Sequence, residues 1–285
     1  MTFRLANIDG RAALVDTDGG WHDLASASGG SLSSDPMAAL ADLPALHRVA
    51  DDLQPGAASG SFADALTAGR VGAPVPRPAS VFGVGLNYRT HAEESGMELP
   101  ATPLVFAKFP TCVVGPTDDV RLNTAFGDHE VELVVVIGAG GRDIPKERAW
   151  DHVAGLTVGQ DISDRVLQFA AKPPHFDLGK SRDTYGPIGP MVVSVDAVPN
   201  PDDLALRCEV DGVQYQADRT SNLIFDVPHL VSYLSGILTL QPGDLIFSGT
   251  PEGVGGSAGR FLQPGNVITS TIDGIGTITN RCVER

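Results

Sequence analysis

The sequence predicts an α+β fold that is rich in β-strands, with a small N-terminal domain ahead of a larger one. The chain has 285 residues, enough for a large domain plus a small one, and 42% of them are hydrophobic, enough for a sizeable core. Glycine (33) and proline (21) are abundant, which favours turns and short strands over long helices. The hydrophobic pattern also changes after a proline-rich segment near residue 75.

The first part of the chain, residues 1–75, predicts a small α+β domain. Short apolar runs and amphipathic stretches predict strands at 3–8 and 12–15, a polar loop at 25–35, and helical stretches at 36–53 and 61–68. The segment Val71–Pro78 (VGAPVPRP) cannot continue a helix because of its prolines. We therefore expect a domain boundary there and little chemistry in the part before it.

The remainder, residues 76–285, predicts a β-rich domain built around a mixed sheet. Apolar runs of four to nine residues, rich in Val, Ile and Thr, alternate with turns of Gly, Pro and Asp. Helices are expected only near 146–152, 164–171 and 226–234.

Charge and composition exclude several classes of partner. The net charge is −15, which argues against nucleic acid and anionic membranes. The chain has no apolar run of membrane-spanning length, and its start lacks the apolar core of a signal peptide. The three cysteines lie far apart and form neither a disulfide framework nor a zinc motif. We expect a soluble, cytoplasmic protein.

A carboxylate pattern is the strongest chemical signal. In DHEVELVVVIG, Glu130 and Glu132 are two residues apart and share one face of a strand. Because the following run is apolar on both faces, the strand is expected to be buried, and a hard divalent cation would neutralise the paired charges. Asp161, at the end of GLTVGQD, is the expected third ligand. The pattern also fits an edge strand whose glutamates face solvent.

A histidine lies beside a glutamate after another apolar run. In NYRTHAEESG, His91 and Glu94 are three residues apart, hence neighbours on a short helix. A carboxylate orients an imidazole and raises its basicity, as a general base requires. A surface histidine with a solvated glutamate fits the same letters.

Basic and polar groups that suit an anion gather later in the chain. Arg165, Gln168, Lys180 and Arg182 lie close together in an otherwise acidic sequence, and Lys180 is a candidate to stabilise an enolate. In FSGTPEGVG, the Thr250 hydroxyl and the amides of the turn are candidates to bind a carboxylate. Each motif taken alone is more often an ordinary turn or salt bridge. Neither GxxxxGK[ST] nor a Rossmann GxGxxG is present.

Taken together, these motifs resemble the fumarylacetoacetate hydrolase family from about residue 80 to residue 283. The stretches that carry the resemblance are GLNYRTHAEE, PLVFAKFP, DHEVELVVVIG, GQDISDRVLQ, GKSRDTYGPIGP, QPGDLIFSGTPEGVG and DGIGTITN. Three positions depart from the family pattern. Gln160 stands where Asn is usual, Arg182 where an aromatic residue is frequent, and Phe109 where a proline is often found.

The resemblance implies a mixed β-roll core, a homodimer, and a site for Mg²⁺ or Mn²⁺ held by Glu130, Glu132 and Asp161. It implies that His91 and Glu94 activate water and that Lys180 lies near the substrate carbonyl. The residues assigned to substrate binding are Tyr88, Arg165, Gln168, Arg182 and Thr250.

The implied activity is hydrolysis of the C3–C4 bond of a small 2,4-diketo acid of the acylpyruvate type. The products are pyruvate, or a substituted pyruvate, and a carboxylic acid. The same constellation supports tautomerisation of an unsaturated 2-oxo-dioate and decarboxylation of oxaloacetate. A catalytically silent protein that binds 2-oxo acids is the alternative from a different class.

Overall fold

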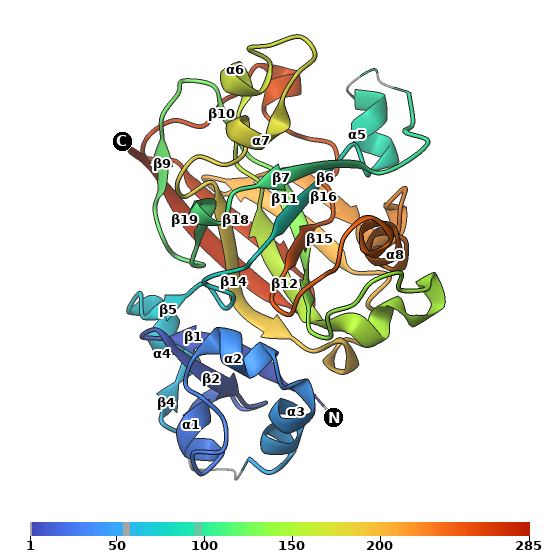
Figure 1. The fold of residues 1–285 in the computed structure, drawn as a ribbon. Helices are drawn as coiled ribbons and strands as arrows, with labels where there is room; N and C mark the ends of the chain where they lie inside the picture. The colour runs from blue at the N-terminus through green and yellow to red at the C-terminus, as the bar shows by residue number, and fades with distance from the viewer. Residues whose placement is uncertain (1, 54–57, 95, 97) are drawn as a thin grey trace.

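A computed structural model describes residues 2–53, 58–94, 96 and 98–285 (Figure 1). Within these residues, twelve strands form one sheet, in the order β4-β3-β2-β1-β14-β12-β11-β17-β6-β7, with β5 on β1 and β8 on β14. Its strands are β1 (Arg4–Ile8), β2 (Arg11–Val15), β3 (Gly20–Asp23), β4 (Gly60–Ser61), β5 (Val71–Gly72), β6 (Val81–Gly85), β7 (Leu104–Lys108), β8 (Val113–Val114), β11 (Val131–Ile137), β12 (Val153–Gln160), β14 (Gly186–Val193) and β17 (Leu245–Phe247).

A second sheet packs against the first, and a two-stranded sheet lies beside them. The second sheet has the order β16-β15-β18-β19-β9 in the described part of the chain. Its strands are β9 (Val120–Leu122), β15 (Ala205–Val210), β16 (Val213–Arg219), β18 (Val267–Ile272) and β19 (Gly276–Glu284). The small sheet pairs β10 (Gly127–Asp128) with β13 (Ser163–Asp164).

The helices are short, as the glycine and proline content predicts. The α-helices are α1 (Leu24–Ala27), α2 (Pro36–Leu40), α3 (Leu43–Asp51), α4 (Phe62–Thr67), α5 (Arg89–Glu94), α6 (Arg165–Gln168), α7 (Phe176–Gly179) and α8 (Val227–Ile237). The 3₁₀-helices are η1 (Pro110–Cys112), η2 (Lys146–His152), η3 (Val195–Ala197), η4 (Thr220–Asn222) and η5 (Gly256–Ala258). Of the described helices, none is long and apolar enough to cross a lipid bilayer.

The central strand β11 explains how the core is organised. It pairs with β12 on one side and with β17 on the other, and all of its residues are buried. Leu133 and Val135 belong to a core cluster on one face, whereas Val134 and Val136 belong to a cluster on the other. A strand that is apolar on both faces needs cover on both, which this position in the sheet provides.

The N-terminal region continues the same sheet rather than standing apart from it. Strand β1 pairs antiparallel with β14, with Leu5 opposite Val192. Phe3 and Leu5 share a core cluster with Val134 and Val192. Figure 1 shows these N-terminal elements (blue) gathered at one end of the molecule. Backbone hydrogen bonds and apolar packing therefore cross the predicted boundary near residue 75.

Several predicted helices differ from those observed. The predicted helix at 36–53 is two helices, because Asp42 caps a new one at the Ala45 amide and Pro44 lies in its first turn. The stretch at 146–152 forms a 3₁₀-helix, and that at 164–171 is helical only over Arg165–Gln168. The prediction at 226–234 is confirmed by α8, which Asp226 caps.

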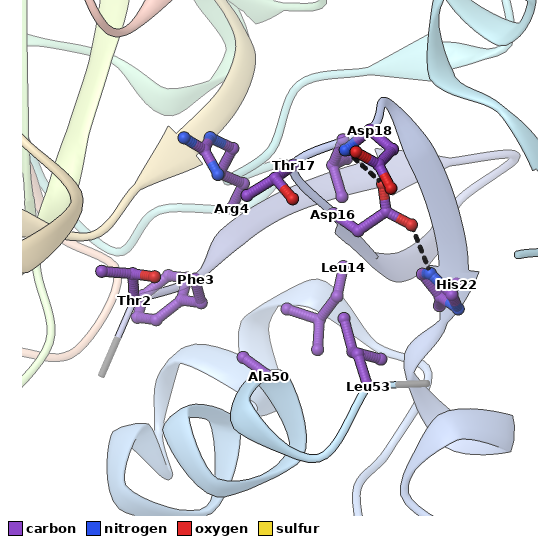
Figure 2. Close-up of a pocket in the computed structure, with 11 residues that line it drawn as sticks. Thr2, Phe3, Arg4, Leu14, Asp16, Thr17, Asp18, His22, Ala50 and Leu53 are labelled. Atoms are coloured by element: carbon purple, nitrogen blue, oxygen red, sulfur yellow. Dashed lines mark hydrogen bonds and ion pairs between the residues drawn. The ribbon is translucent and has the colours of Figure 1, made fainter. Parts of the chain in front are cut away.

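A cavity of about 180 Å³ lies between the first strands and α3 (Figure 2). On its wall, Asp16 Oδ2 lies 2.9 Å from His22 Nε2, and Asp16 Oδ1 accepts the amides of Asp18 and Gly20. The carboxylate therefore fixes the turn between β2 and β3.

The burial of the central sheet gives a stability prediction. Leu156 in β12 is fully buried, so Leu156→Ala should lower the free energy of unfolding by about 3 kcal/mol through lost transfer energy and a residual cavity. Leu178→Ala is the control, since that side chain is 59% exposed and its truncation should cost less than about 0.5 kcal/mol. Urea unfolding measures both, and equal losses would contradict the assignment of Leu156 to the core.

Candidate metal centre and active-site cavity

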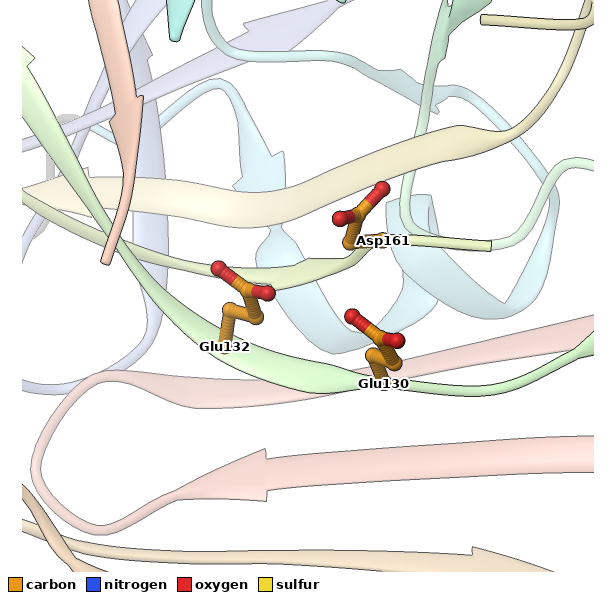
Figure 3. A group of neighbouring side chains, drawn as sticks. All are labelled: Glu130, Glu132 and Asp161. Carbon is orange, nitrogen blue, oxygen red and sulfur yellow. The ribbon is translucent and has the colours of Figure 1, made fainter. Parts of the chain in front are cut away.

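Three buried carboxylates converge where β11 begins and β12 ends (Figure 3). Glu130 and Glu132 lie on one face, and the pairing of Val131 with Gln160 sets Asp161 opposite them. Each contributes an oxygen, and these oxygens all lie within 4.8 Å of one another. The prediction of two glutamates on one buried face is confirmed. The edge-strand alternative is wrong, because β11 is paired on both sides.

Backbone and amide hydrogen bonds fix the positions of these carboxylates. The Asp161 amide donates to the Glu130 carbonyl at 2.9 Å. The Glu130 amide donates to Gln160 Oε1 at 2.9 Å, so the glutamine that replaces the usual asparagine holds a candidate ligand in place. Glu132 Oε2 accepts the Gly249 amide at 2.7 Å.

Two buried lysines compensate the carboxylates. The Lys180 ammonium donates to three oxygens: Glu130 Oε2 at 2.8 Å, Asp161 Oδ2 at 2.7 Å and Ser163 Oγ at 2.9 Å. The preceding Gly179 permits this position, since a Cβ there would lie 2.8 Å from the Gln168 amide nitrogen. Lys108, at the end of β7, donates to Asp161 Oδ1 at 2.7 Å.

Sequence reasoning missed Lys108 as a member of the site. The signal was present in PLVFAK, where a lysine ends an apolar strand and is only 1% exposed in the fold. A lysine is almost never buried without a partner, so its burial at a strand end indicates a nearby carboxylate.

Arg165 and Asp128 form a second ion pair behind the triad. Arg165 donates to Asp128 Oδ2 through Nε at 2.8 Å and Nη2 at 2.7 Å, and to Glu130 Oε1 at 2.7 Å. Its Nη1 donates to Gln168 Oε1 at 2.9 Å. Burial opposes the charge on Arg165, but Glu130 and Asp128 outweigh it and raise its pKa. Asp128 was not among the predicted site residues.

The charges around the triad do not balance, and a bound cation would neutralise the excess. Within the described part of the chain, four buried carboxylates at this site (Asp128, Glu130, Glu132 and Asp161) face three cations (Lys108, Lys180 and Arg165). One negative charge is therefore in excess when all are ionised. Burial raises the pKa of Glu132 well above its ordinary value, and the charges of Asp161 and Glu130 raise it further. For Glu130, burial is outweighed by Lys180 and Arg165, which lower its pKa.

The donor set fits a hard divalent cation. Glu130, Glu132 and Asp161 offer only carboxylate oxygens, which Mg²⁺ and Mn²⁺ prefer. Glu132 is the least compensated of the three and would gain most from a bound cation. The residues present therefore match the predicted site for a divalent metal.

The glycine-rich turn after β17 binds carboxylates of the chain itself. The amides of Gly255 and Gly256 donate to Asp128 at 2.7 and 2.9 Å, and the Gly253 amide donates to Glu94 at 3.2 Å. Gly253 has φ +95°, and a Cβ there would lie 1.9 Å from the Tyr215 carbonyl oxygen. These are the amides that the sequence pattern suggested for a substrate carboxylate, and in the fold Asp128 and Glu94 already accept hydrogen bonds from three of them.

The Thr250 hydroxyl also makes its hydrogen bonds within the protein. Its hydroxyl donates to the Val131 carbonyl at 2.9 Å and accepts from Gln216 Nε2 at 2.8 Å. The side chain lines the cavity, but its hydrogen is already used, so a ligand carboxylate would require the hydroxyl to rotate.

The predicted histidine–glutamate pair is present on α5. Nδ1 of His91 lies 3.3 Å from Glu94 Oε2, and the Gly253 amide holds that carboxylate from the other side. This chain of contacts orients the imidazole from the turn after β17.

Part of this cluster lines a cavity of about 450 Å³, to which the triad contributes Glu130 and the histidine–glutamate pair contributes His91. Its polar wall carries His91, Glu130, Arg165, Gln168, Lys180 and Thr250. Two predicted substrate residues do not line it. Tyr88 is fully buried, and its hydroxyl has no hydrogen-bond partner among the residues that the structure describes. Arg182 donates to Asp164 at 2.8 Å.

Comparison with known proteins identifies the family. The fumarylacetoacetate (FAA) hydrolase C-terminal family matches residues 80–283. The chain belongs to the fumarylacetoacetate hydrolase family. The β-rich α+β fold predicted from the sequence is confirmed by solved structures of similar proteins.

Solved structures similar to this chain include proteins named as a hydrolase and as an isomerase. A Mycobacterium smegmatis protein provisionally named HpcE is 45% identical, with a TM-score of 0.91 and 99% of each chain covered. A protein from Mycobacterium abscessus, named as a probable 2-hydroxyhepta-2,4-diene-1,7-dioate isomerase, is 26% identical, with a TM-score of 0.83 and 100% and 99% coverage. A maleylpyruvate hydrolase from Sphingobium sp. SYK-6, solved with manganese(II) and pyruvate, is 28% identical, with a TM-score of 0.81 and 99% of each chain covered.

The buried lysine gives a testable consequence. Lys108→Met should lower the free energy of unfolding of the metal-free protein by about 3 kcal/mol, because it leaves Asp161 with less compensation in the core. The control is Lys146→Met, which removes an exposed ion pair with Asp226 and should cost less than about 1 kcal/mol. Chemical unfolding in EDTA measures both, and a cost for Lys108→Met as small as that of the control would contradict its role.

The raised pKa of Glu132 predicts an unusual stabilising substitution. Because the folded state holds this proton more tightly than the unfolded chain, ionisation removes stability as the pH rises through the raised pKa. Metal-free Glu132→Gln should therefore be more stable than wild type above the ordinary carboxyl pKa range, and the difference should vanish below it. Thermal unfolding across the pH range in EDTA measures this.

The same variant should lose stabilisation by metal. Mn²⁺ at about 100 times its Kd should stabilise wild type by about 2.7 kcal/mol, and Glu132→Gln by far less. A variant that is stabilised by Mn²⁺ as strongly as wild type would exclude Glu132 as a ligand.

Proposed function

We propose that this protein is a Mg²⁺- or Mn²⁺-dependent hydrolase that cleaves the C3–C4 bond of a small 2,4-diketo acid of the acylpyruvate type. The observation that carries the proposal is the convergence of a carboxylate triad, a histidine–glutamate pair and a buried lysine at one cavity, which Glu130, His91 and Lys180 line. The relative solved with manganese(II) and pyruvate supports both the metal and a pyruvate-type ligand.

Glu130, Glu132 and Asp161 would hold the divalent cation. When bound, the cation supplies Lewis acidity and a template for the 2-oxo-carboxylate end of the substrate. Arg165 and Gln168 line the same wall beside Glu130 and contribute hydrogen-bond donors for orientation.

His91 is the base in this proposal. Glu94 holds Nδ1 and stabilises the imidazolium, so the imidazole takes a proton from water. The hydroxide attacks the C4 carbonyl, and the tetrahedral intermediate collapses with cleavage of the C3–C4 bond. The bonding electrons pass to C3 as the enolate of pyruvate, and C4 leaves as the carboxylic acid.

Lys180 stabilises the developing enolate. Its ammonium is buried, and its pKa is raised, since Asp161 and Glu130 outweigh the effect of burial; it is therefore charged at neutral pH. Return to C3 of the proton that His91 took from water completes the formation of pyruvate and regenerates the base.

Isomerisation is the second candidate function. It is favoured by the relative named as a dioate isomerase, and it needs the same enolate stabilisation without attack by water. Decarboxylation of oxaloacetate needs no activated water either, so it depends on His91 much less than hydrolysis does. The homodimer implied by the family resemblance remains a prediction.

The proposed roles of His91 and Lys180 can be separated by substrate. His91→Ala should reduce acylpyruvate cleavage on the order of 10²-fold or more and impair oxaloacetate decarboxylation much less, since only cleavage needs activated water. Lys180→Ala should impair both, because both pass through an enolate. The measurement is kcat/KM for each substrate at saturating Mg²⁺, with His229→Ala on α8 as a control outside the cavity. Equal losses on both substrates for His91→Ala would exclude it as the water-activating base and favour isomerisation.

A further inference from the structure

An aromatic wall leads from the buried lysine to the mouth of the cavity. Phe106 on β7 is 8% exposed, and its ring centroid lies 5.2 Å from Lys180 Nζ. It contacts Phe176 edge-on at 5.7 Å between centroids, and Phe176 contacts Phe169 at 6.3 Å. Phe169, which follows α6, is 56% exposed. The three rings thus form a continuous path from the reacting centre to solvent.

The other walls of the cavity are also largely apolar. Beyond the polar residues already described, the lining includes Val84, Leu86, Pro174, Val254 and Phe261, with one further hydroxyl from Ser257. Phe261 is held edge-on by Phe126 at 5.1 Å between ring centroids. A substrate that extends from the triad toward the mouth therefore passes between hydrocarbon surfaces.

The cations of the cavity are already committed near the triad. Among the described residues that line it, the lysine and arginine side chains are Lys180 and Arg165. All three N–H groups of Lys180 have acceptors, and Arg165 bonds Asp128, Glu130 and Gln168. Neither cation is therefore free to pair with a carboxylate at the far end of a substrate.

A second carboxylate on the substrate would meet the aromatic wall without a cation of its own. The faces of aromatic rings carry partial negative charge, and an unpaired carboxylate in apolar surroundings loses hydration without compensation. Arg182, which sequence analysis placed among the substrate residues, is paired with Asp164 instead. An apolar group would cover the exposed Phe169 and gain from its burial.

We propose that the acyl group accepted by this cavity is apolar and carries no second carboxylate. The inference rests on the proposed function and deepens it by naming the substrate class: acylpyruvates with an alkyl or aryl acyl group. This chain then differs in specificity from the relatives whose names specify maleylpyruvate and a diene-1,7-dioate.

A matched pair of 2-oxo acids tests this inference by binding alone. 2-Oxohexanoate and 2-oxoadipate have the same number of carbons and the same 2-oxo-carboxylate end, but only 2-oxoadipate carries a second carboxylate at the other end. Calorimetry on the Mn²⁺-loaded protein should show 2-oxohexanoate binding tighter than pyruvate by a factor of about 10 to 60, since each buried methylene contributes about fourfold. It should bind at least about tenfold tighter than 2-oxoadipate. Binding of 2-oxoadipate as tight as that of 2-oxohexanoate would overturn the inference.

Variants assign the preference to the aromatic wall. Phe169→Ala should reduce the ratio of affinities for 2-oxohexanoate over pyruvate about fivefold or more. The matched control is Phe109→Ala, which removes a ring that is 49% exposed but does not line the cavity, and should leave the ratio unchanged. If the affinity ratio of Phe169→Ala is as high as that of Phe109→Ala, the assignment of the preference to this wall is overturned.

The kinetic arm keeps this inference separate from the proposed function. Cleavage of hexanoylpyruvate should exceed that of the corresponding ω-carboxylate compound in kcat/KM by at least about tenfold. If neither compound is cleaved while the binding preference holds, hydrolysis fails and the specificity stands. If both are cleaved equally and bind equally, the specificity fails and hydrolysis stands.

Discussion

The compensation of buried carboxylates is the constraint on which the rest of the site depends. Four carboxylates are buried here: Asp128, Glu130, Glu132 and Asp161. Burying such charges without compensation would cost more free energy than the fold has in stability. The fold therefore has to bring Lys108 from β7, Lys180 from the segment after α7 and glycine amides from the turn after β17 to the same place. The register of β11 against β12 has no freedom to slip, because a shift of one residue would turn the glutamates to the opposite face.

Local periodicity explains what the sequence alone could predict. A two-residue spacing puts Glu130 and Glu132 on one face of any strand, and a three-residue spacing makes His91 and Glu94 neighbours on any helix. The structure shows both arrangements. The strand-rich character of residues 76–285 followed from the same kind of local pattern, as did the Asp226-capped helix α8.

What the sequence could not predict depends on partners that are distant along the chain. Lys108 meets Asp161 across 53 positions, and Asp128 meets the Gly255 amide across 127. The sequence of the turn after β17 suggests backbone amides that are free to bind a ligand. In the fold, those amides donate hydrogen bonds to Asp128 and Glu94 instead. The same limit applies to Thr250 and Arg182. Their hydrogen-bond partners, Val131 and Asp164, lie in strands β11 and β13.

The pairing of β1 with β14 bears on how this protein can be shortened. The family match begins only at residue 80, which makes the N-terminal region look dispensable. Yet a fragment cut there would leave β14 with unpaired backbone groups around Val192 and uncover the apolar cluster that contains Ile188 and Val136. An open, flat, hydrophobic strand edge is a template for intermolecular β-pairing. We therefore expect a fragment that begins at residue 80 to aggregate more readily than the full chain, because strand β1 covers this edge of β14.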